Sequence, residues 1–90
     1  MTPEQRQEIE VQIQTDFSEL QKKLEGLKNE IQTETDDSKK QGKNEEIQKL
    51  EKELSEMKTL IESLRSLQEA DLQSLKSRLE SLKNTIQNFR

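Results

Sequence analysis

The chain contains no cysteine and no histidine. Without cysteine it can form neither a disulfide nor a thiolate zinc site, so the sequence does not indicate a redox compartment. Without histidine it lacks the most common general base and metal ligand near neutral pH. Serine recurs in the second half, but a nucleophilic serine needs a base to activate it. We therefore expect a protein that is not an enzyme and that binds no cofactor.

Tryptophan and tyrosine are also absent, and the only aromatic residues are Phe17 and Phe89. The hydrophobic fraction of 27% is well below the roughly 45–50% of an average globular domain. Charged residues make up 38%. Such a composition is typical either of a disordered chain or of a coiled coil, whose seam needs only two apolar positions in seven. The spacing of the apolar residues decides between the two.

The formal net charge of −4 argues against general nucleic-acid binding, which favours a basic surface. No apolar run approaches the roughly 20 residues that span a bilayer. The first residues contain no apolar segment of the secretory type. We expect no nucleic-acid partner, no membrane span and, by default, a cytoplasmic location.

Apolar residues recur at spacings of three and four in three stretches, and this spacing places each set on one face of a helix. The first stripe is Ile9, Ile13, Phe17, Leu20, Leu24, Leu27 and Ile31; the second is Ile47, Leu50, Leu54, Met57, Ile61 and Leu64, broadened by Leu60 and Leu67; the third is Leu72, Leu75, Leu79, Leu82, Ile86 and Phe89. Val11 lies off the first stripe, and we expect it to be exposed. The pattern favours a coiled-coil-type helical protein over a disordered one.

The first helix is predicted to begin at Pro3, with Thr2 as N-cap and Gln5 completing a capping box. Residues 32–46 contain no large apolar side chain and mark the one clear break. The helix could end before a turn at residues 36–38, or continue to residue 41 and end at a left-handed Gly42. We place the first helix at residues 3–36.

The second helix is predicted at residues 44–67, with Asn44 as its N-cap. The third stripe is out of phase with the second, because continuing the heptad would put Gln68 and Asp71 on the core line. Either one long helix contains a four-residue stutter there, or the chain turns at residues 68–71 and Asp71 caps a third helix at residues 71–90.

Absence of Gly, Pro and Asn between residues 57 and 83 favours the continuous helix. Charge favours the turn. The third stripe is flanked by basic residues, and a turn would bring them toward acidic residues beside the second stripe. The basic flanks are Lys76, Arg78, Lys83 and Arg90, and the acidic ones are Glu46, Glu51 and Glu53. We predict an all-α fold, an antiparallel three-helix bundle in a single domain of residues 1–90, with a helical hairpin whose long second helix self-associates as the alternative.

The leading functional hypothesis is a structural or adaptor module that binds protein partners, either itself or another helical protein, through amphipathic helices. If the second helix is continuous, the third stripe has no partner within the chain and becomes the candidate binding surface. This surface comprises Leu72, Leu75, Lys76, Arg78, Leu79, Leu82, Lys83, Ile86 and Phe89. The oligomeric state stays open.

The alternative hypothesis is a regulator that inserts the polar tip, residues 34–43, into a larger macromolecular machine. Its candidate residues are Glu34, Asp36 and Asp37. Three carboxylates could hold Mg²⁺ or Ca²⁺. Their spacing does not match an EF-hand loop, however, and lysines 39 and 40 are adjacent. We expect a solvated polar turn and no metal.

Overall fold

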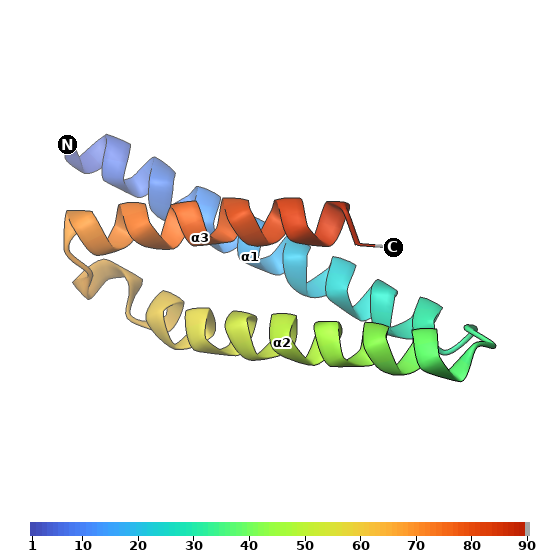
Figure 1. Cartoon of the computed structure of the whole chain (residues 1–90). Coiled ribbons are helices and arrows are strands. Elements are labelled where there is room, and N and C mark those ends of the chain that lie inside the picture. Colours follow the sequence, from blue (N-terminus) through green and yellow to red (C-terminus); the bar gives the residue numbers. More distant parts are fainter. Residues whose placement is uncertain (90) are drawn as a thin grey trace.

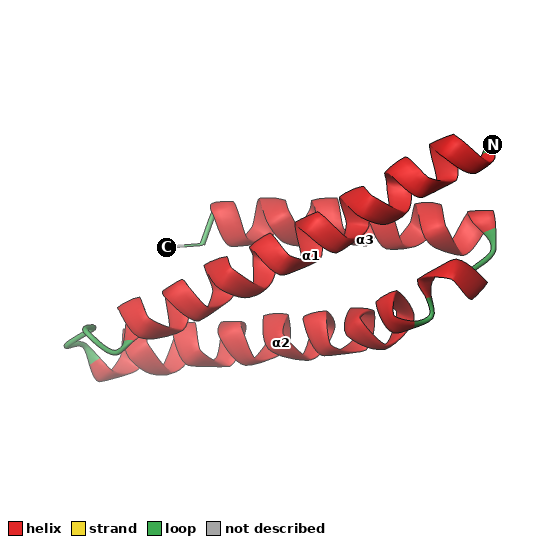
Figure 2. Ribbon diagram, turned by 180° about the vertical axis from the view of Figure 1, so that it is seen from behind, coloured by secondary structure: helices red, strands yellow, loops and turns green. Residues whose placement is uncertain are grey.

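The computed structural model describes residues 1–89 and is all-α. It comprises α1 (Pro3–Ile31), α2 (Asp37–Glu62), a short 3₁₀ helix η1 (Leu64–Ser66) and α3 (Glu69–Gln87). Figure 1 shows that α2 runs opposite to both α1 and α3. The molecule is an elongated rod that measures 52 by 17 by 16 Å. The two connections lie at opposite ends of this rod (Figure 2). The prediction of an antiparallel three-helix bundle is confirmed.

The three apolar stripes meet in one core, because each helix has a single face that excludes water. The buried side chains are Ile13, Phe17, Leu20, Leu24, Ile31, Ile47, Leu50, Leu54, Met57, Leu64, Leu72, Leu75, Leu79, Leu82 and Ile86. Every one belongs to a predicted stripe, and among the described residues no polar or charged one is buried. Val11 is 55% exposed, as its position off the stripe predicts.

The predicted start of α1 is confirmed in detail. The Thr2 hydroxyl accepts from the backbone N–H of Gln5 at 3.1 Å, and the Gln5 side chain accepts from the Thr2 N–H at 3.0 Å. The end was placed wrongly, because α1 ends at Ile31 rather than at residue 36. Ile31 is the last residue of the stripe to reach the core, so packing no longer stabilises the helix beyond it.

The prediction that α2 begins at residue 44 is also wrong, because the helix starts seven residues earlier, at Asp37. Its N-cap is Asp36, whose carboxylate accepts from the Lys39 N–H at 3.1 Å. Asn44 therefore lies inside the helix. Gly42 does too, and no glycine has a positive φ. The polar residues that follow Asp36 are mostly good helix formers, so an effective cap suffices to start the helix before the apolar stripe begins.

The second turn lies a few residues earlier than predicted. α2 ends at Glu62 rather than at residue 67, and η1 reverses the chain while keeping Leu64 buried. α3 then starts at Glu69. Asp71 is not its cap but lies in its first turn, where a negative charge complements the helix dipole. The predicted end at residue 90 lies outside the described residues, and α3 ends at Gln87.

Candidate functional site

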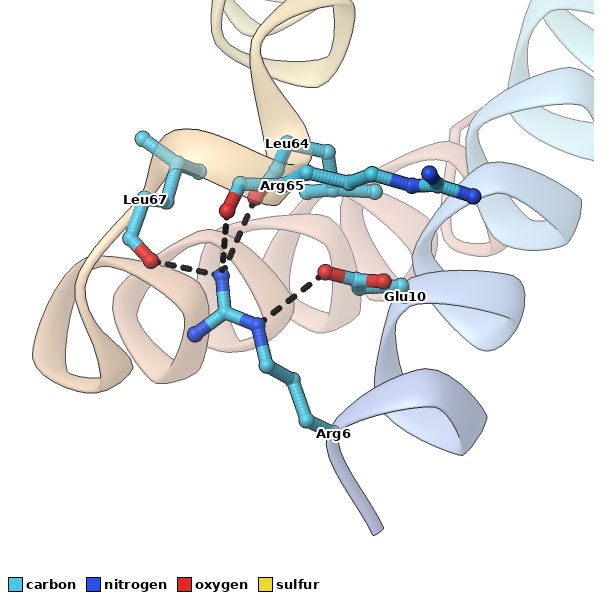
Figure 3. Close-up of polar contacts among 5 residues, drawn as sticks. All are labelled: Arg6, Glu10, Leu64, Arg65 and Leu67. Carbon is cyan, nitrogen blue, oxygen red and sulfur yellow. Dashed lines mark hydrogen bonds and ion pairs between the residues drawn. The ribbon is translucent and has the colours of Figure 1, made fainter. Parts of the chain in front are cut away.

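The most connected polar side chain in the structure is that of Arg6 on α1, which lies against the turn between α2 and α3 (Figure 3). Its Nη2 donates to the backbone carbonyls of Leu64 at 3.2 Å, Arg65 at 3.4 Å and Leu67 at 2.6 Å. Its Nε donates to the carboxylate of Glu10 at 3.1 Å. We call Arg6, Glu10 and these three carbonyls the Arg6 clamp.

The Arg6 clamp serves the ends of helical segments, where carbonyl groups lose their intrahelical partners. A guanidinium carries five N–H donors and a fixed positive charge, so it can satisfy several carbonyls at once. Glu10 accepts from the other side and holds the guanidinium in place. The clamp thus fastens the start of α1 to a turn about 60 residues away in the sequence.

The candidate tip residues Glu34 and Asp36 hold the first turn together. The carboxylate of Glu34 accepts from Lys43 Nζ at 3.1 Å and from the Asp36 N–H at 3.2 Å. The hydrogen bond from Lys43, followed by that from Asp36, lowers the pKa of Glu34 below its usual value. Asp36 caps α2, while Asp37 is exposed in its first turn.

Within residues 1–89 no group of three or more carboxylate, imidazole or thiol side chains is placed to hold a metal ion. No described helix combines the length and the apolar composition needed to cross a membrane.

Two interhelical ion pairs lie on the surface. Nζ of Lys28 in α1 lies 3.0 Å from Oε1 of Glu51 in α2. The hydrogen bond between them raises the pKa of Lys28 above its usual value. Arg78 of α3 is 3.9 Å from Glu56 of α2.

The apolar part of the third stripe is packed inside the chain itself. Leu72, Leu75, Leu79, Leu82 and Ile86 are all at most 5% exposed, whereas Lys76, Arg78, Lys83 and Phe89 are half-buried at its edges. The hypothesis that this stripe binds a partner assumed a helix with no intrachain neighbour. In the closed bundle the stripe is covered, so it can meet a partner only if α3 leaves its place.

An open groove of about 900 Å³ lies between the first turns of α2 and the last turns of α3. Its α2 wall consists of Lys39, Gly42, Lys43 and Glu46, and its α3 wall of Asn84, Thr85, Asn88 and Phe89. We call this the α2–α3 groove. Phe89 packs against the edge of the core. A Cβ atom added at Gly42 would meet no other atom within 4 Å, so the space over this glycine is open.

The sequence missed both the Arg6 clamp and the α2–α3 groove. Backbone carbonyls have no sequence signature, and the groove joins residues about 40 positions apart. No protein-family model, curated protein or solved structure matches the chain.

Proposed function

We propose that the chain is a non-catalytic helical module that binds another protein in the α2–α3 groove. The observation that carries this proposal is the make-up of the groove, which sets the half-buried Phe89 beside polar and charged walls over about 900 Å³. Protein interfaces commonly combine an aromatic anchor with a polar rim. A groove between two helices also suits the docking of a third helix by its apolar face.

The lining of the groove indicates what kind of helix fits. Phe89 offers an apolar contact, while Asn84 and Asn88 can both donate and accept hydrogen bonds. On the opposite wall Lys43 is paired with Glu34, and Lys39 supplies a positive charge near the carboxylate of Glu46. A partner helix with one apolar side chain and a neighbouring carboxylate would match this arrangement.

Gly42→Trp tests the proposal by filling the groove. The open space over Gly42 accepts a side chain, and replacing a glycine inside a helix removes a cost of up to about 1 kcal/mol. The bundle should therefore fold while the groove is blocked. Gly26→Trp is the matched control, because Gly26 also lies in a helix with open space over it but lines no groove wall.

The measurement is affinity capture on immobilised wild type, Gly42→Trp and Gly26→Trp, quantified by mass spectrometry. A partner of the groove should bind wild type and Gly26→Trp equally and bind Gly42→Trp at least about tenfold less, the equivalent of about 1.4 kcal/mol. An identical set of proteins on all three would contradict the proposal.

The second candidate is the regulator that inserts its tip, residues 34–43. What favours it is position, because the loop between α1 and α2 lies beyond the C-terminal end of α3 (Figure 1). Replacing Glu34 or Asp36 would disturb the fold, since both stabilise the turn. Asp37→Asn removes an exposed charge instead. Because Gly42 lies in both the tip and the groove, Thr85 on the α3 wall separates the two proposals. If the tip inserts, Asp37→Asn weakens capture and Thr85→Trp does not, and the reverse holds for the groove.

A further inference from the structure

The turn between α2 and α3 is built from residues that do not require a turn. Residues 57–83 contain no Gly, Pro or Asn. The N-cap of α3, Gln68, makes no side-chain capping hydrogen bond, and η1 has none either. Residues 63–68, Ser-Leu-Arg-Ser-Leu-Gln, would all be accepted in a continuous helix at modest cost. The bend must therefore be stabilised by contacts from outside the segment.

The Arg6 clamp supplies such contacts at carbonyls whose α-helical hydrogen bonds the bend breaks. In an uninterrupted α-helix, each carbonyl accepts from the N–H four residues later. The carbonyls of Leu64, Arg65 and Leu67 would then accept from residues 68, 69 and 71. In the bent chain, the Leu64 carbonyl accepts from the Leu67 N–H at 3.2 Å instead, and Nη2 of Arg6 donates to all three carbonyls. Arg6 thus stabilises the bent form over the straight one.

We propose that α2 and α3 can straighten into one helix over residues 37–87, that two copies of the chain then exchange α3, and that the Arg6 clamp keeps the single chain closed. This inference goes beyond the proposed function and does not depend on the α2–α3 groove. The straight helix would be about 75 Å long, at 1.5 Å per residue. It would carry the third stripe away from its own α1.

The partner is a second copy because the chain itself shows what covers the third stripe. The five core side chains of α3 belong to the one core that all three helices share, with α3 packed mainly against α1, and a second copy presents the same surfaces. Direct pairing of two exposed third stripes would place Lys76, Arg78 and Lys83 beside one another, which like-charge repulsion disfavours. Exchange of α3 avoids this repulsion. Arg78 pairs with Glu56 of its own α2 in the closed chain, and after exchange it would pair with Glu56 of the second copy in the same way.

Arg6→Met tests the role of the clamp, since it removes the donors and keeps an unbranched side chain. Each lost clamp should favour opening by on the order of tenfold, as expected for hydrogen bonds to a charged group. Two clamps open per dimer, so sedimentation equilibrium should give a dimer dissociation constant roughly a hundredfold lower than that of wild type. Arg65→Met, which removes a neighbouring exposed guanidinium outside the clamp, should leave the constant within about threefold.

Adding Gln68→Pro to Arg6→Met separates exchange from other association. Residue 68 has φ −71° and follows Leu67 at φ −72° and ψ 142°, a conformation that suits proline and its preceding residue. In the straight helix the same proline would remove the hydrogen bond to Leu64 and clash with the preceding turn. The double variant should return to the monomer. A monomeric, helical Arg6→Met, or a double variant that dimerises as strongly as the single one, would overturn the proposal.

If Arg6→Met does not fold, wild type and Gln68→Pro provide the test. Both are heated at millimolar concentration, cooled and separated by size-exclusion chromatography. Wild type should yield a dimer fraction that persists on dilution because exchange back requires unfolding, and Gln68→Pro should yield at most about a tenth of it. Equal dimer fractions, or none in either sample, would overturn the proposal.

Discussion

Lys43 reaches back across the first turn to Glu34, and its Nζ lies 3.1 Å from the glutamate oxygen. The two residues belong to different segments, since Glu34 lies in the loop and Lys43 in the second turn of α2. The pair ties the start of α2 to the end of α1. Because the carboxylate also accepts from the Asp36 N–H, its protonation affects the whole turn.

The lowered pKa of Glu34 predicts a pH-dependent contribution to stability. In the unfolded chain the carboxyl titrates near its usual value of 4.5, and in the folded chain it titrates lower. The contribution is therefore fully present above about pH 4.5 and is lost as the pH falls through the folded-state pKa. Glu34→Gln should have a lower melting temperature than wild type at pH 7, and the two melting temperatures should be equal at about pH 2. Glu19→Gln, an exposed glutamate of α1, is the control, and an equal loss in both variants at pH 7 would contradict the role of the pair.

Because the three stripes share one core, we predict that replacing a buried leucine in any one of them destabilises the whole protein. Leu24→Ala, Leu54→Ala and Leu75→Ala each empty space around a side chain that is at most 5% exposed, so each should lower the free energy of unfolding by about 2–5 kcal/mol. Val11→Ala should change it by less than about 0.5 kcal/mol, because Val11 is exposed. Urea titration followed by circular dichroism measures all four. Comparable losses for Val11→Ala and the leucine variants would show that the helix faces are assigned wrongly.

The observed cap of α2 predicts a contrast between two polar residues. Asp36→Ala removes the acceptor for the Lys39 N–H and should cost about 1 kcal/mol. Asn44→Ala lies within the helix and should be neutral or slightly stabilising, because alanine is the better helix former. The same urea titrations give both values. The opposite order would restore Asn44 as the start of α2.

The core could be read from the sequence because it depends on side-chain spacing alone. Ile13 and Leu72 are both fully buried. Each falls on the same helix face as the other core residues of its helix only at the helical spacing of three and four residues. The helix ends were less predictable. Asp36 and Asn44 both have side chains that suit an N-cap position, and the sequence alone does not show which of the two starts the helix.

The turn between α2 and α3 was predicted from the charge pattern, but it was placed a few residues too late. The sequence around the turn does not fix its position, because the contacts that stabilise it are tertiary. Arg6 stabilises the bend from about 60 residues away, through backbone acceptors that any residue provides. Propensity alone would continue α2 through Gln68. The α2–α3 groove likewise exists only once α3 has folded back beside Gly42.

The most direct test of the account is the distance between spin labels at positions 49 and 87, both exposed, in dilute wild-type background. The closed bundle places these sites on neighbouring antiparallel helices, so pulsed electron resonance should give a distance below about 25 Å, roughly two helix diameters. A continuous helix from α2 through α3 would separate them by about 57 Å, at 1.5 Å per residue. A dominant distance near that value in the dilute protein would contradict the three-helix bundle and every site built on it.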